Sequence, residues 1–176
     1  MCEHCGCRQV EPLAELMDEH FALLDQASDI RHALGRRDHS AALELLGNLA
    51  TRLDQHVRRE EDGVFTALKE TGEFTDAVLE LEQEHHDFDT HIAALDPADP
   101  GFEHDVRRLF AHLSEHIDKE NLGIFPVSVV TLGARGWDTV SRVHGEQPSF
   151  LLSPDDRPGP ATAEVGSNGP SVPDRA

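Results

Sequence analysis

The chain has 176 residues and is 38% hydrophobic, which is enough for one sizeable core and typical of a single domain. Asp and Glu number 34 against 15 Lys and Arg, and the formal net charge of -19 would repel nucleic acid and anionic membranes. There is no apolar run of membrane-spanning length and no apolar secretory signal, so a soluble, cytoplasmic protein is expected.

All three cysteines lie in the first seven residues, at Cys2, Cys5 and Cys7, with His4 among them. They are too close together to form a disulfide framework that holds a fold. Cys-x-x-Cys spacing suits metal uptake or an accessible redox role, and a flexible end without a fixed role is the alternative. Residues 1–9 are therefore treated as a separate cysteine-rich segment.

Four stretches then repeat apolar residues at spacings of three and four, as helices packed in a bundle do. They cover residues 13–34, 46–63, 78–95 and 106–127. The first stops at Gly35, the second ends near Gly72, and the third is closed by the segment DPADPG, which cannot continue a helix. In the fourth, Pro126 is expected to kink or end the helix.

Short connections between long amphipathic helices force antiparallel neighbours, so the sequence predicts an all-α, up-down-up-down four-helix bundle over residues 10–145. A short fifth helix is expected at residues 136–144, with Trp137 packed back on the bundle. Residues 146–176 hold six of the ten prolines together with Gly, Ser and Asp, which predicts a disordered tail.

Each of the four stretches becomes polar at its middle, on the face that points into the bundle. The inward polar residues are His20, His56, Glu60, His85, His116 and Glu120. A single inward histidine is most often an ordinary core residue. Six polar groups at one height must instead neutralise one another or bind a cation, because unpaired buried carboxylates and imidazoles are costly.

A repeated motif favours the cation. HVRREEDGVF at residues 56–65 and HIDKENLGIF at residues 116–125 share a histidine followed four residues later by a glutamate. Residues at i and i+4 lie on one helix face, so both side chains reach the same ion.

The other two helices also match each other. LAELMDEH at residues 13–20 corresponds to VLELEQEH at residues 78–85, which selects His85 rather than His86 as the inward residue. The chain is therefore interpreted as a duplicated helix pair, and two copies predict a pseudo-symmetric site for two metal ions that Glu60 and Glu120 could bridge.

The ligand types favour iron, with manganese or zinc second, because imidazole and carboxylate are combined without thiolate. Ferritin-like sites use Glu-x-x-His on two helices, whereas that spacing occurs here only at Glu82 and His85.

At these residues the sequence resembles the hemerythrin-like (HHE cation-binding) domain family, over roughly residues 13–130. The resemblance implies a bundle that holds two iron ions as an oxo- or hydroxo-bridged centre. It further implies that the terminal ligands are His20 and His56 on one iron and His85 and His116 on the other, with Glu60 and Glu120 bridging.

The third helix departs from the oxygen-carrying members, which place a His-x-x-x-His pair there, because Asp89 follows four residues after His85. The set resembles six-ligand members linked to nitric oxide chemistry, peroxide removal and iron-centre repair. This implies reaction with hydrogen peroxide, nitric oxide or dioxygen in oxidative or nitrosative stress defence, as a catalase-like or nitric oxide-detoxifying oxidoreductase. A dioxygen carrier or sensor and an iron reservoir or donor are the alternatives, and Glu82, Asp89 or His112 could add a ligand.

Overall fold

The computed structural model describes residues 6–152, and within this range every regular element is helical. In chain order the elements are η1 (Cys7–Gln9), α1 (Glu11–Gly35), α2 (His39–Arg59), η2 (Glu60–Phe65), α3 (Thr66–Thr71), α4 (Thr75–Ala93), α5 (Phe102–Lys119), η3 (Glu120–Ile124), α6 (Phe125–Thr131) and α7 (Ala134–Glu146). None of these helices is long and apolar enough to cross a membrane.

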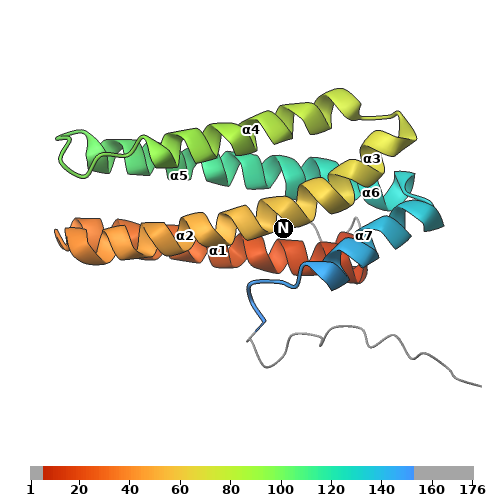
Figure 1. Ribbon diagram of the computed structural model, residues 1–176, viewed down its shortest axis with the longest axis horizontal. Helices are drawn as coiled ribbons and strands as arrows, with labels where there is room; N and C mark the ends of the chain where they lie inside the picture. The colour runs from red at the N-terminus through yellow and green to blue at the C-terminus, as the bar shows by residue number, and fades with distance from the viewer. Residues whose placement is uncertain (1–5, 153–176) are drawn as a thin grey trace, which may run out of the picture.

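The predicted four-helix bundle is confirmed (Figure 1). Its second helix is α2, η2 and α3 in unbroken succession, and its fourth is α5, η3 and α6. The first and second helices pack together as one pair, and α4 with α5 form the other. The expected ends are also found, since α1 stops at Gly35 and α3 stops before Gly72, whose φ of 77° is a left-handed conformation that glycine tolerates.

Both η2 and η3 are π-helical segments, and each begins at the glutamate of the repeated motif. The N–H of Thr66 bonds to the carbonyl of Glu61, and the N–H of Phe125 bonds to that of Glu120, in each case five residues back. The extra residue in each turn was not predicted from the sequence. Such π segments inside α-helices often lie at functional sites.

Pro126 was expected to kink or end the fourth helix, and it does not end it, because helical structure continues to Thr131. Pro126 stands in the first turn of α6, directly after η3, where the chain returns from π to α spacing. A proline is tolerated in the first turn of a helix because the missing N–H would have no regular partner there.

Two apolar clusters fill the bundle, one on each side of its polar middle. One contains Leu23, Leu53, Phe88 and Leu113, and the other contains Leu16, Phe65, Leu68, Leu81 and Phe125, each with further buried neighbours. Full burial of one such side chain contributes about 1.5–3 kcal/mol to folding. The polar layer is therefore enclosed by well-packed hydrocarbon above and below it.

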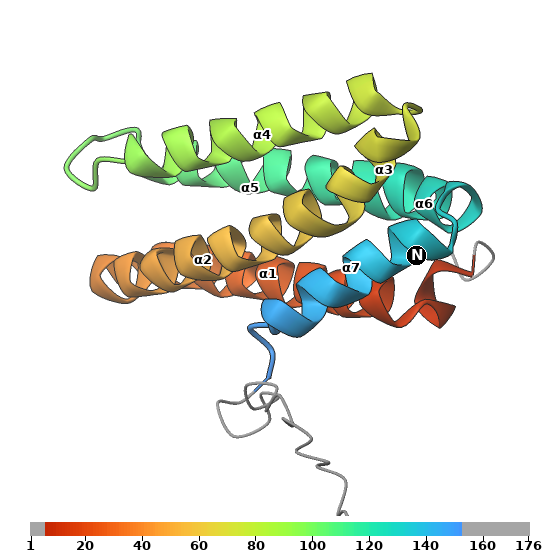
Figure 2. The same ribbon diagram turned by 45° about the vertical axis from the view of Figure 1, so that its right-hand side comes forward.

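The predicted fifth helix is confirmed as α7, which packs across η2 and α3 on the outside of the bundle (Figure 2). Trp137 packs against the second apolar cluster, as expected. Residues 147–152, placed with the tail in the sequence analysis, contact the bundle, and Phe150 packs against the first cluster. The remainder of the predicted tail, residues 153–176, lies outside the described residues.

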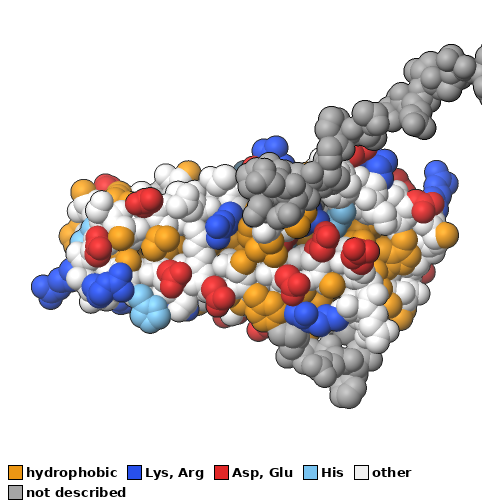
Figure 3. All heavy atoms as spheres, turned by 90° about the horizontal axis from the view of Figure 1, so that it is seen from below, with side chains coloured by type: hydrophobic (Ala, Val, Ile, Leu, Met, Phe, Trp, Pro, Cys, Tyr) orange, Lys and Arg blue, Asp and Glu red, His pale blue; other side chains and the backbone are white. Residues whose placement is uncertain are grey.

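Acidic side chains are spread along the length of the face that Figure 3 shows.

Candidate metal centre

All six residues predicted from the sequence meet in the middle of the bundle, and each is at most 4% exposed. One histidine comes from each of α1, α2, α4 and α5, and the two glutamates are the first residues of η2 and η3. In this order they are His20, His56, His85, His116, Glu60 and Glu120. The residues lie in two groups that share a carboxylate.

The first group consists of His20, His56, Glu60 and Glu120, whose potential ligand atoms lie within 4.8 Å of one another. His20 Nε2 is 3.4 Å from Glu60 Oε1 and 3.1 Å from Glu120 Oε2. His56 Nε2 is 3.2 Å from the same Oε1 atom of Glu60. Two imidazole nitrogens and two carboxylates therefore point at one small volume.

The second group consists of His85, His116 and Glu120. His116 Nε2 is 3.1 Å from Glu120 Oε1, and the Nε2 atoms of the two histidines are 2.9 Å apart. His85 Nε2 lies 3.6 Å from both Glu120 Oε1 and Glu60 Oε2. Glu120 thus belongs to both groups, and Glu60 reaches the edge of the second.

The donor atoms fit a bound cation. His20 Nε2 and all four carboxylate oxygens of Glu60 and Glu120 are buried and lack a hydrogen-bond partner of good geometry. A buried polar atom left in this state costs about 1–3 kcal/mol. A metal ion in each group would satisfy these atoms, and imidazole with carboxylate is a ligand set suited to iron, manganese or zinc.

In each of the four histidines of the two groups, the other ring nitrogen, Nδ1, has its own hydrogen-bond partner. The Nδ1 partners are Glu19 for His56 at 2.7 Å, Glu84 for His116 at 2.8 Å, Glu61 for His85 at 2.9 Å and Asn121 for His20 at 3.1 Å. Such partners fix the tautomer and orientation of a metal-ligating imidazole, so that Nε2 faces the metal.

These partners were not predicted from the sequence, although the signal was present in the repeats. Glu19 directly precedes His20, and Glu84 directly precedes His85, in the matched segments LAELMDEH and VLELEQEH. Glu61 and Asn121 each stand directly after the motif glutamate. The duplication therefore extends beyond the six inward residues to the groups that hold them.

A further layer follows the same pseudo-symmetry. The residue before each motif glutamate is basic: Arg59 forms ion pairs with Glu15 and Glu19, and Lys119 forms ion pairs with Glu80 and Glu84. The two cations differ in environment, because the side chain of Arg59 is 1% exposed and that of Lys119 is 48% exposed. The two helix pairs thus place the same kinds of charged residue around the centre, but the basic side chain is buried in the first pair and exposed in the second.

Helix α7 covers the first helix pair. Arg59 Nη2 donates to His144 Nδ1 of α7 at 2.8 Å. A Cβ atom placed on Gly63 would lie 3.7 Å from Val143 of α7, whereas one on the equivalent Gly123 would meet nothing within 4 Å. The small size of Gly63 therefore allows the close approach of α7.

In the metal-free protein the layer is held by opposite charges. Burial lowers the pKa of His20, but the close negative charges of Glu120 and Glu60 outweigh it and raise that pKa to about 10. Burial is outweighed in the same way at His85, whose pKa is raised to about 10 by Glu120 and its neighbouring carboxylates. Burial and Glu120 raise the pKa of Glu60, but the histidines lower it overall to about 2.

Aromatic rings enclose the layer. Phe125 stacks on His20 with ring centroids 5.6 Å apart, and Phe65 stacks on His85 at 5.7 Å. Phe88 meets His116 edge to face at 5.2 Å. These contacts line the polar layer with hydrocarbon.

The additional candidate ligands from the sequence lie elsewhere among the described residues. Glu82 forms an ion pair with Lys69, and both Asp89 and His112 are exposed. None of the three belongs to either group. Exposed His86 also lies outside them, as predicted.

The cysteine segment is described only in part. Cys2, His4 and Cys5, for which a metal or redox role was considered, lie outside the described residues. Cys7 is disulfide-bonded and 1% exposed, and it packs in the second apolar cluster.

A family model described as the hemerythrin HHE cation-binding domain matches residues 11–128, a range that contains both groups. Comparisons with curated proteins and with solved structures found no match.

Proposed function

Since the chain belongs to the hemerythrin HHE cation-binding domain family, we propose that it is a non-haem di-iron protein that reacts with hydrogen peroxide, nitric oxide or dioxygen. Domains of this family bind metal ions, typically iron, and the buried histidine and glutamate groups of this chain can hold a metal. The number of ions, the reaction and a role in oxidative or nitrosative stress defence are our proposal.

The observation that carries the proposal is the pair of donor groups joined by Glu120. One ion would be held by His20 and His56 and the other by His85 and His116, with Glu60 and Glu120 between them. A single ion in the first group would leave Glu60 Oε2 and Glu120 Oε1, the oxygens nearest His85 and His116, buried without a good partner, at a cost that a second ion removes.

Two bound iron ions would supply redox chemistry and open coordination positions for a small ligand. The protein's part is to hold them. Glu19 and Glu84 orient His56 and His116, and Glu61 orients His85, so the ring nitrogens are set before any ion binds.

The surroundings select small, neutral ligands. Phe65, Phe88 and Phe125 contact the histidine rings and exclude bulk water from the layer. Few protein donors are available to each ion, since no other His, Cys, Asp or Glu of residues 6–152 joins either group. This low number favours reaction with an exogenous ligand.

The test uses protein with its iron counted, reduced without air and then mixed separately with hydrogen peroxide, nitric oxide and dioxygen while the optical spectrum is followed. Rapid, irreversible oxidation by peroxide, or consumption of nitric oxide over many turnovers, would support the proposal. An optical change with dioxygen that reverses under vacuum would instead indicate a carrier or sensor. Loss of iron to a mild chelator without reaction would indicate an iron donor.

A further inference from the structure

The two halves of the pseudo-symmetric centre are closed to different degrees. Behind His56, the carboxylate of Glu19 is 0% exposed and its partner Arg59 is 1% exposed. The side chain of His144, which α7 places against Arg59, is 7% exposed. This side of the centre is sealed by protein.

Behind His116, the equivalent layer faces a groove. Its carboxylate partner Glu84 is 26% exposed, and the Lys119 that pairs with Glu84 is 48% exposed. Glu84, Lys119 and Phe88 line a groove of about 290 Å³ between α4 and α5, and the ring of His116 forms part of its wall. Exposed ion pairs such as Lys119 with Glu84 are weak and open readily. A buried pair such as Arg59 with Glu19 opens much less readily, because an unpaired buried charge is costly.

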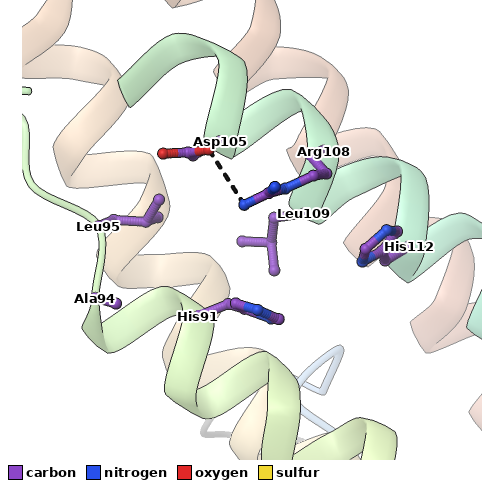
Figure 4. A pocket seen from close by; sticks show the side chains of 7 residues that line it. All are labelled: His91, Ala94, Leu95, Asp105, Arg108, Leu109 and His112. Carbon is purple, nitrogen blue, oxygen red and sulfur yellow. Dashed lines mark ion pairs between the residues drawn. The ribbon is translucent and has the colours of Figure 1, made fainter. Parts of the chain in front are cut away.

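The groove continues away from the centre into a hollow of about 80 Å³ (Figure 4). Both are lined by His91 from α4 and His112 from α5, which lie on opposite walls of the hollow. Asp87 and Glu115 line the groove together with Glu84, so its lining holds three carboxylates against the one ammonium group of Lys119. A groove with this charge attracts a cation, and the imidazoles of His91 and His112 are potential ligands for it.

We propose that the α4–α5 groove is the path by which a hydrated divalent cation enters and leaves the centre, with His91 and His112 as transient ligands on the way. The inference rests on the proposed two-ion centre. Its consequence is unequal exchange: the position at His116 exchanges with solvent through the groove, and the position at His56 is retained behind α7.

The experiment uses the full chain loaded with Zn²⁺, which needs no redox control, and mixes it with a chromogenic chelator in a stopped-flow instrument. The wild-type protein should release its metal in a fast and a slow phase of equal amplitude. The variant His112→Trp fills the groove and should slow the fast phase several-fold without changing the slow phase. The matched control, His86→Trp, places the same bulk on the exposed face of α4 outside the groove and should change neither phase.

A second variant tests the sealed side. His144→Ala removes a contact that α7 makes with Arg59, so it should accelerate the slow phase and leave the fast phase unchanged. An unchanged fast phase in His112→Trp, or an equal effect of His86→Trp, would overturn the proposed path. Fewer than two Zn²⁺ per chain would contradict the proposed function instead, and the effect of His112→Trp on release of the remaining ion would still decide the route.

Discussion

The Nδ1 atom of His56 donates a hydrogen bond to Oε2 of Glu19, 2.7 Å away, while Nε2 of the same ring lies 3.2 Å from Glu60. Glu84 and His116 repeat this relationship in the second helix pair, at 2.8 Å. Each imidazole is therefore held from behind and presents its other nitrogen to the polar layer.

Replacement of Glu84 by glutamine should weaken metal binding roughly 10- to 100-fold, because the negative charge that orients and polarises His116 is lost. Glu19→Gln should act similarly at His56. Affinities measured by competition with a chelator would test this. Glu80→Gln is the control, since Glu80 is mainly exposed and reaches only Lys119. An equal loss in all three variants would contradict a specific orienting role.

Removal of the two pseudo-equivalent cations should have unequal effects on folding. Arg59→Met leaves Glu19 buried without its cation and should lower the free energy of unfolding by about 3–5 kcal/mol. Lys119→Met breaks an exposed pair and should change it by no more than about 1 kcal/mol. Urea denaturation of both variants in the metal-free state measures the difference. Similar losses would mean that the burial of Arg59 and Glu19 does not strengthen the contribution of their ion pair.

The metal-free protein should become less stable as the pH rises. Despite burial, the carboxylates raise the pKa of His20 and His85 from 6.5 to about 10. A raised pKa in the folded state contributes stability that is complete below 6.5 and is lost as the pH rises to about 10. Thermal denaturation of the metal-free protein across this range tests the sign, and a melting temperature that increases with pH would contradict it.

The acid side of the same profile has the opposite cause. Burial and Glu120 raise the pKa of Glu60, but the nearby histidines prevail and lower it from 4.5 to about 2. This contribution to stability is present above pH 4.5 and is lost as the pH falls towards 2.

Metal uptake must displace the protons on the histidines, so proton release on loading should be measurable by calorimetry in buffers of different ionisation enthalpy.

Gly63 and Gly123 should differ in their tolerance of a large side chain. At Gly63 a leucine would press on Val140 and Val143 of α7, and such overpacking typically costs about 1–3 kcal/mol. At Gly123 the same substitution meets open space. Thermal denaturation of Gly63→Leu and Gly123→Leu compares the two, and equal melting temperatures would show that α7 yields without cost.

Much of the centre could be predicted from helical periodicity alone. An inward polar residue breaks a regular apolar pattern, so His20 and its five companions were visible one helix at a time. The orienting residues were harder to assign, because Glu19 and Glu84 lie one position from the inward face and look like solvent-facing charges. Only their matched positions in the two copies carried a signal.

Other features depend on contacts that a linear pattern does not contain. The π segments at Glu60 and Glu120 change the helical spacing by one residue over a single turn, which is too short to alter the apolar period. Pro126 was expected to kink or end the fourth helix because a proline disrupts a regular helix interior, but it stands in the first turn after a π segment and the helix continues. The motif glycines are equivalent in the sequence, but α7 packs on Gly63 alone.

These six residues are expected to hold two iron ions, and counting the iron tests this directly. Wild-type protein loaded under anaerobic conditions and freed of excess metal is compared with Glu120→Ala, Glu60→Ala and His86→Ala by elemental analysis. We expect two irons per chain in the wild type and in His86→Ala, and loss of most of the iron in both glutamate variants. Equal iron in all four proteins would contradict it.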